Sequence, residues 1–180
     1  MISSEKITAL PVMPVILTRI FDNRLYLPNA SHDFSKLRYV SCSGGPVSEK
    51  MLDNVRRAFP QTDICLMFGL TEAFRCTYLP SHLVNSRPTS IGVPIPDVDI
   101  YVMDDDYSIC PANVPGQMVH RGGCVTKGYW NDPQRTAQVF RQIPQFPGET
   151  VVFTGDIVTR DEDGFLYYVG RADSMIKSHG

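Results

Sequence analysis

The sequence predicts a mixed α/β fold, with a partial parallel α/β subdomain followed by a small antiparallel β-barrel-like subdomain. Residues 37–67 read as strand, glycine loop, helix and strand, which is the pattern of a βαβ unit with a parallel strand pair. Residues 98–169 hold short apolar runs with the period of half-buried strands, separated by turn signals. The length of 180 residues and the apolar fraction of 43% allow a buried core and exclude a disordered chain.

The first half of the chain alternates strands with a helix. Residues 37–40 are a strand candidate, and residues 41–46 follow as a loop of small residues. Apolar side chains then recur at helical spacing over residues 47–59, with Ser48 as the expected N-cap and Pro60 as the stop.

The next short apolar run, residues 64–67, predicts a second strand, and residues 68–72 are expected to form the loop after it. The carboxyl ends of parallel strands meet at one sheet edge, where ligands bind in open α/β folds. The loops at residues 41–46 and 68–72 are therefore expected to share that edge.

The second half is predicted to be mostly antiparallel strands. Residues 98–102 alternate apolar and polar side chains, and Gly164 marks a hairpin turn. Asp132 and Pro133 predict the N-cap and first position of a short helix. The further strand candidates are residues 117–120, 151–154, 157–160 and 165–169.

These patterns divide the chain into three expected parts. Residues 1–84 form the partial α/β subdomain, residues 85–171 the β-rich barrel subdomain, and residues 172–180 a hinge segment.

Composition excludes several classes of function. The formal net charge of −2 excludes the strong basic field of a general nucleic-acid binder. No signal peptide and no apolar run long enough to span a bilayer are present in the sequence. The five cysteines lack the C-x-x-C spacing of metal sites, which favours buried thiols in a reducing compartment. We therefore expect a cytoplasmic protein with no nucleic-acid partner and no membrane span.

Several side chains near the predicted strand ends have the chemistry to bind a nucleotide. Phe68 can stack on a base, the Thr71 hydroxyl can bond a phosphate oxygen, and Glu72 can hold Mg²⁺. Asp156 can accept the hydroxyls of a ribose, and Arg171 offers a fork of donors for ribose or phosphate. Each also has a plain structural interpretation: a tight turn, a solvated glutamate, an aspartate that caps its own turn, or a surface ion pair.

Taken in order, these motifs resemble the adenylate-forming superfamily, which includes acyl- and aryl-CoA ligases, nonribosomal-peptide adenylation domains and luciferases. Each motif is weak alone, but all of them in the correct order are specific. The matching segments are residues 44–47 (GGPV), 68–72 (FGLTE), 90–94 (SIGVP), 116–118 (GQM), 128–133 (GYWNDP) with Thr136, 154–156 (TGD) and 170–177 (GRADSMIK).

The resemblance implies an AMP-forming acyl-CoA ligase. Such an enzyme activates a carboxylic acid, here a fatty acid, with ATP to an acyl-adenylate and then transfers the acyl group to coenzyme A. The implied cofactors are ATP/AMP, Mg²⁺ and coenzyme A. Two alternatives are an adenylation domain that loads an amino or aryl acid onto a carrier protein, and a non-catalytic nucleotide-binding module.

The resemblance also implies roles for individual residues. Thr71 and Glu72 would be the catalytic pair, with Thr71 at the phosphate and Glu72 as the Mg²⁺ ligand. Asp173 would lie at the hinge between two domains. The implied nucleotide-binding residues are Gly44, Gly45, Pro46, Phe68, Gly69, Leu70, Thr71, Asp156 and Arg171.

The sequence lacks the family's Ser/Thr/Gly-rich phosphate loop and its C-terminal domain with a catalytic lysine. We therefore expect an internal fragment that is inactive alone. We also expect that it either self-associates into homo-oligomers through its truncated surfaces or has a partly disordered N-terminal region. Size-exclusion chromatography checks this, since the expected species elutes ahead of a 20.2 kDa monomer. A compact monomer would contradict the expectation.

Overall fold

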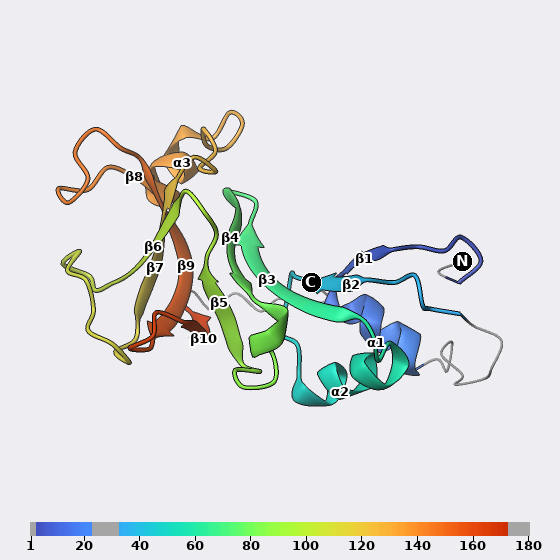
Figure 1. Ribbon diagram of the computed structural model, residues 1–180. Coiled ribbons are helices and arrows are strands. Elements are labelled where there is room, and N and C mark those ends of the chain that lie inside the picture. The colour runs from blue at the N-terminus through green and yellow to red at the C-terminus, as the bar shows by residue number, and fades with distance from the viewer. Residues whose placement is uncertain (1–2, 23–32, 173–180) are drawn as a thin grey trace. The chain divides into compact units, whose positions relative to one another are not determined.

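The computed structural model describes residues 3–22 and 33–172, which fall into two units (Figure 1). The first unit contains the described residues up to Met67 together with residues 79–89, and the second contains residues 68–78 and 90–172. The mixed α/β class predicted from the sequence is confirmed. Among the described residues, no helix has the length and apolar character that crossing a bilayer requires.

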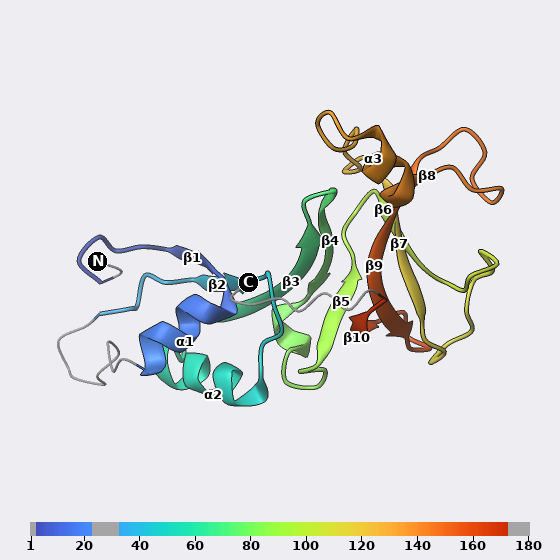
Figure 2. The same ribbon diagram turned by 180° about the vertical axis from the view of Figure 1, so that it is seen from behind.

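The first unit is built on parallel strands with β2 between β1 and β3. Helix α1 follows β1 and helix α2 follows β2, and both helices lie on the same side of the strands (Figures 1 and 2). The predicted βαβ unit is thus present, with β2 and β3 as its parallel pair. The elements are β1 (Ala9–Val12), α1 (Pro14–Asp22), β2 (Tyr39–Cys42), α2 (Glu49–Ala58), β3 (Asp63–Leu70) and the short 3-10 helix η1 (Ser81–Leu83).

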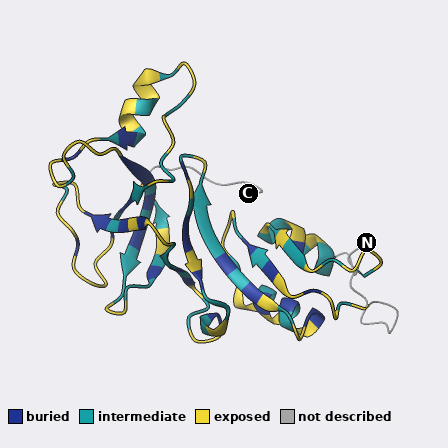
Figure 3. Ribbon diagram, turned by 45° about the horizontal axis from the view of Figure 1, so that its top comes forward, coloured by how far each residue is buried: buried dark blue, intermediate teal, exposed yellow. Residues whose placement is uncertain are grey.

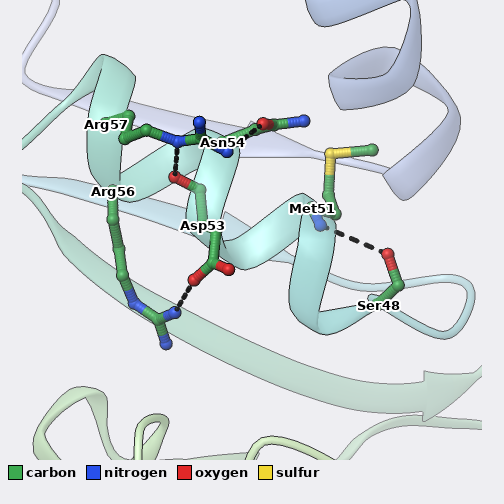
Figure 4. A network of polar contacts seen from close by, with 6 residues as sticks. All are labelled: Ser48, Met51, Asp53, Asn54, Arg56 and Arg57. Atoms are coloured by element: carbon green, nitrogen blue, oxygen red, sulfur yellow. Dashed lines mark hydrogen bonds and ion pairs between the residues drawn. The ribbon is translucent and has the colours of Figure 1, made fainter.

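Helix α2 forms for the local reasons that the sequence indicates. The Ser48 hydroxyl accepts a hydrogen bond from the backbone N–H of Met51 at 3.2 Å, which satisfies one of the unpaired donors of the first turn (Figure 4). Leu52 and Val55 are buried on one side of the helix, whereas the exposed side carries the ion pair between Asp53 and Arg56. The predicted N-cap is confirmed.

The second unit is antiparallel, with neighbouring strands in the order β4-β5-β10-β9-β7-β6 and β8 paired with β9. Helix α3 lies between β7 and β8 in the chain and is mostly exposed (Figure 3). The predicted cap holds, because Asp132 accepts from the backbone N–H of Arg135. The elements are β4 (Ala73–Leu79), β5 (Ser90–Pro94), β6 (Val98–Met103), β7 (Gly116–Gly122), α3 (Pro133–Val139), β8 (Phe140–Arg141), β9 (Val151–Arg160) and β10 (Leu166–Arg171).

Three expectations about strands were wrong. Residues 68–70 are not a loop after a strand but the end of β3, and the unpredicted strand β4 follows after the turn at Thr71 and Glu72. Residues 151–160 form one strand, although Gly155 lies in its middle with a φ of +74°. Because β9 pairs with β7 on one side and with β10 on the other, the strand remains continuous at Gly155. Asp156 therefore lies inside β9 and not at a strand end, whereas Arg171 is the last residue of β10.

The antiparallel sheet is buried on both faces. Successive residues of a strand point to opposite faces, and on β7 Met118 belongs to one core cluster while Val119 belongs to another. The first core cluster, which includes Cys76, Met118, Val152 and Leu166, lies on one face. The second core cluster lies on the other face and includes Val119, Val151, Phe153 and Ile143.

His120 on β7 is the exception in this apolar interior. It is 0% exposed, and its cross-strand partners are Ile100 and Val152, both in the first core cluster. Neither ring nitrogen has a hydrogen-bond partner among the residues that the structure describes. Burial lowers the pKa of His120 from 6.5 to about 4, so the imidazole is neutral at physiological pH.

This buried imidazole predicts a loss of stability in acid. The unfolded chain takes up a proton on His120 below about pH 6.5, whereas the folded chain resists it until pH 4, so stability falls across that window. The free energy of unfolding is expected to drop by about 2 kcal/mol between pH 7.5 and 4.5 through this group. Urea denaturation at the two pH values measures it. His120→Leu is expected to remove this part of the pH dependence, and an unchanged dependence in the variant would contradict the prediction.

Candidate functional site

The glycine loop of the first unit connects β2 to α2 and is exposed. Gly44 has a φ of +90°, a left-handed conformation that favours glycine. A Cβ atom added at Gly44 would lie 3.5 Å from Cγ of Met13, and one added at Gly45 would lie 3.6 Å from Cγ of Pro14. The loops after β1 and β2 are therefore neighbours, with the backbone of residues 44–46 open to solvent.

The turn between β3 and β4 carries Thr71, which is exposed, and Glu72, which is half-buried. Gly69 permits this hairpin, because a Cβ atom there would lie 2.8 Å from the backbone nitrogen of Arg75. Arg75 itself has a φ of +62°, which no sequence signal indicated. The close backbone approach at Gly69 therefore sets the position of Glu72.

Glu72 is held by the segment between β7 and α3. The phenol of Tyr129 donates a hydrogen bond to Oε1 of Glu72, and the backbone N–H of Thr126 donates to the Glu72 carbonyl at 2.9 Å. Burial raises the pKa of Tyr129 and the hydrogen bond to Glu72 raises it further, so the phenol remains a protonated donor at neutral pH. No signal in the sequence indicated this contact with Glu72.

Trp130, beside Tyr129, is 98% exposed. Phe68, in contrast, is half-buried and packs against the first core cluster.

Asp156 and Arg171 face each other across β9 and β10. They are register partners, and Nη1 of Arg171 lies 3.2 Å from Oδ1 of Asp156. The same Nη1 donates to the carbonyl of Thr154 at 2.9 Å. Asp156 has only 2% of its surface exposed, so the guanidinium supplies the counter-charge that a buried carboxylate requires.

A bulge and a glycine produce this pairing. The register of β10 shifts between Tyr168 and Gly170, which brings Arg171 opposite Asp156. A Cβ atom at Gly155 would lie 2.7 Å from Nη2 of Arg171, so the guanidinium occupies the space that a side chain would need.

The two predicted carboxylates lie near the same buried thiol. Burial raises the pKa of the Cys76 thiol to about 12, and the negative charges of Asp156 and Glu72 contribute to that rise. Cys76 lies on β4 and is 0% exposed. Phe68, Glu72, Asp156 and Arg171 all belong to the second unit. Asp173 lies outside the described residues.

The Glu72 carboxylate suits a metal ion that takes most of its other ligands from phosphates and water. Among the described residues, no group of three or more His, Cys, Asp or Glu side chains could hold a metal. Mg²⁺ usually takes one or two carboxylates and completes its shell with water and substrate phosphates. Glu72, with one oxygen bonded to Tyr129, fits that limited role and not a cage made by the protein.

Comparisons with known proteins identify relatives in sequence and in fold. A family model described as AMP-binding enzyme matches residues 1–130. Tyrocidine synthase 3 of Brevibacillus parabrevis is 31% identical over 148 residues, which cover 82% of this chain and 2% of that synthase. The chain thus spans a small part of the length of such relatives.

Solved structures with the same fold include VinN, with a TM-score of 0.81 and 31% identity over 94% of this chain and 41% of that one. A long-chain-fatty-acid-CoA ligase (FadD1) from Archaeoglobus fulgidus has a TM-score of 0.82 and 25% identity, covering 94% of this chain and 35% of that one. The similarity extends across nearly the whole chain in both cases.

The contact between Gly155 and Arg171 can be tested with a matched pair of variants. Gly148 also has a positive φ, +82°, but nothing lies within 4 Å of an added Cβ. Gly148→Ala is expected to cost about 1 kcal/mol of backbone strain. Gly155→Ala is expected to cost about 2 kcal/mol more, because it also displaces Arg171 from a buried carboxylate. Urea denaturation of both variants measures the difference, and equal losses would show that the guanidinium contact contributes nothing.

Proposed function

The chain belongs to the AMP-binding enzyme family of adenylate-forming enzymes, and we propose that it contributes the nucleotide site of a ligase that activates a carboxylic acid with ATP. The observation that supports this proposal is the buried ion pair of Asp156 and Arg171, which lies in the same unit as Glu72. These are acceptors and donors suited to ribose hydroxyls and phosphate oxygens.

The proposed reaction begins with the acid. A carboxylate oxygen attacks the α-phosphorus of ATP, and the bond from that phosphorus to the β-phosphate oxygen breaks. Pyrophosphate leaves with the electron pair, and an acyl-adenylate forms. A carboxylic acid is ionised at neutral pH, so this step needs no general base. Catalysis then rests on positioning and on stabilisation of the phosphoryl charge.

In this proposal Asp156 accepts hydrogen bonds from the ribose hydroxyls. Because Asp156 is only 2% exposed, the ribose gains access when the Arg171 guanidinium turns away from it. The Arg171 side chain is 16% exposed and can donate to a phosphate or ribose oxygen instead. The pair thus exchanges an internal ion pair for contacts with the nucleotide.

The phosphate end would be bound by the β3–β4 turn. Thr71 is exposed and donates its hydroxyl to a phosphate oxygen, and Glu72 holds the metal ion. Mg²⁺, when bound, neutralises charge on the phosphate oxygens. Phe68, which is half-buried against the first core cluster, packs beside the adenine.

Two classes of acid and thiol are candidates. The likeness to the fatty-acid ligase supports a fatty acid with coenzyme A as acceptor. The likeness to gramicidin S synthase 2 of Brevibacillus brevis, 28% identical over the full chain, supports an amino acid and a carrier protein. Because the peptide synthetases predominate among the relatives, we favour the amino acid.

Acid-dependent exchange of labelled pyrophosphate into ATP tests the function in the full-length natural polypeptide. Exchange is expected with amino acids and not with fatty acids, and the opposite preference would restore the fatty-acid assignment. Glu72→Gln and Asp156→Asn are each expected to lower exchange by about two orders of magnitude. Glu162→Gln, an exposed acid in the β9–β10 turn, is the control and is expected to be neutral. No exchange with any acid would refute the proposal.

A further inference from the structure

Glu72 is positioned by a residue outside its own sequence motif. Its side chain accepts a hydrogen bond from the Tyr129 phenol at Oε1, although the two residues are 57 positions apart. Its backbone is held by the same segment, through Thr126 and through the bridge between Ala73 and Val125. Residues 125–129 therefore hold Glu72 at both its main chain and its carboxylate.

Tyr129 is itself fixed at its backbone and its ring. Its backbone N–H donates to Oγ1 of Thr136 at 2.9 Å, and that hydroxyl donates to the carbonyl of Asp132 at 2.7 Å. The Arg135 guanidinium lies 4.5 Å from the centre of the tyrosine ring, and Phe140 meets the ring edge-to-face at 5.8 Å. The phenol thus has little freedom to leave Glu72.

Gly128 makes the contact with Thr136 possible. It has a φ of +125°, and a Cβ atom there would lie 2.5 Å from Cγ2 of Thr136. Only glycine allows the chain to bring the tyrosine backbone against the first turn of α3. The start of α3, which is capped by Asp132, is therefore the base from which the Tyr129 hydroxyl reaches Glu72.

We propose that Tyr129 is a positioning residue that holds the Glu72 carboxylate in the orientation required by the metal-bound triphosphate. The proposal rests on the proposed role of Glu72. With Oε1 bonded to the phenol, the other oxygen is directed as a single ligand. Without the phenol, the flexible glutamate side chain must be ordered when the metal arrives, which weakens binding.

The test uses Tyr129→Phe, which removes the hydroxyl and keeps the ring beside Arg135 and Phe140. Affinity of the full-length natural polypeptide for Mn·ATP is followed by the electron paramagnetic resonance of Mn²⁺, and affinity for AMP by calorimetry. Mn·ATP binding is expected to weaken about tenfold, with AMP binding unchanged. Tyr107→Phe is the control, because it removes a hydroxyl with no hydrogen bond to another described residue.

A double-mutant cycle with Glu72→Gln separates positioning from general damage. If Tyr129 acts through the carboxylate, Tyr129→Phe is expected to have no further effect on Mn·ATP binding in the Glu72→Gln background. Additive losses, or an equal loss of AMP binding, would overturn the proposal. If Mn·ATP binding is unchanged in Tyr129→Phe but weakened in Glu72→Gln, the proposal for Tyr129 is overturned while the proposed metal role of Glu72 stands. Unchanged binding in Glu72→Gln would remove the proposed metal role and this inference together.

Discussion

The buried carboxylate of Asp156 in β9 is the main constraint on the second unit. Asp156 is 2% exposed, and an isolated charge at such a depth is costly. Arg171 offsets that cost from the neighbouring strand, at 3.2 Å. The pairing holds only with the β10 bulge that brings the two residues into register and with a glycine at position 155 that leaves space for the guanidinium. One ion pair thus constrains the register of two strands and a backbone conformation.

The same unit also buries the imidazole of His120, which has no hydrogen-bond partner among the described residues. His120 can lose its charge at little cost, since its unperturbed pKa lies near neutrality. A buried carboxylate needs a counter-charge, and Arg171 supplies it to Asp156. A buried group that is easily neutralised needs none.

Glu72 shows a second way to place a polar group, by support from a distant segment. The β3–β4 turn sets its backbone, and Tyr129 sets its carboxylate from a loop anchored on α3. Asp156 and Glu72 belong to the same unit, yet each is held by a different support. In the proposed function, Asp156 binds the ribose and Glu72 acts at the phosphates.

The sequence by itself determined what depends on near neighbours and on motif order. Ser48 and Asp132 were predicted as caps from their residue types and their positions before a helix, and each accepts a hydrogen bond from a backbone N–H three residues away. The order of the motifs along the chain indicated the superfamily. Only the tertiary structure decided that Gly155 continues a strand, since that outcome requires ladder partners on both sides. It alone revealed the bond between Tyr129 and Glu72, because a contact across 57 positions leaves no local pattern.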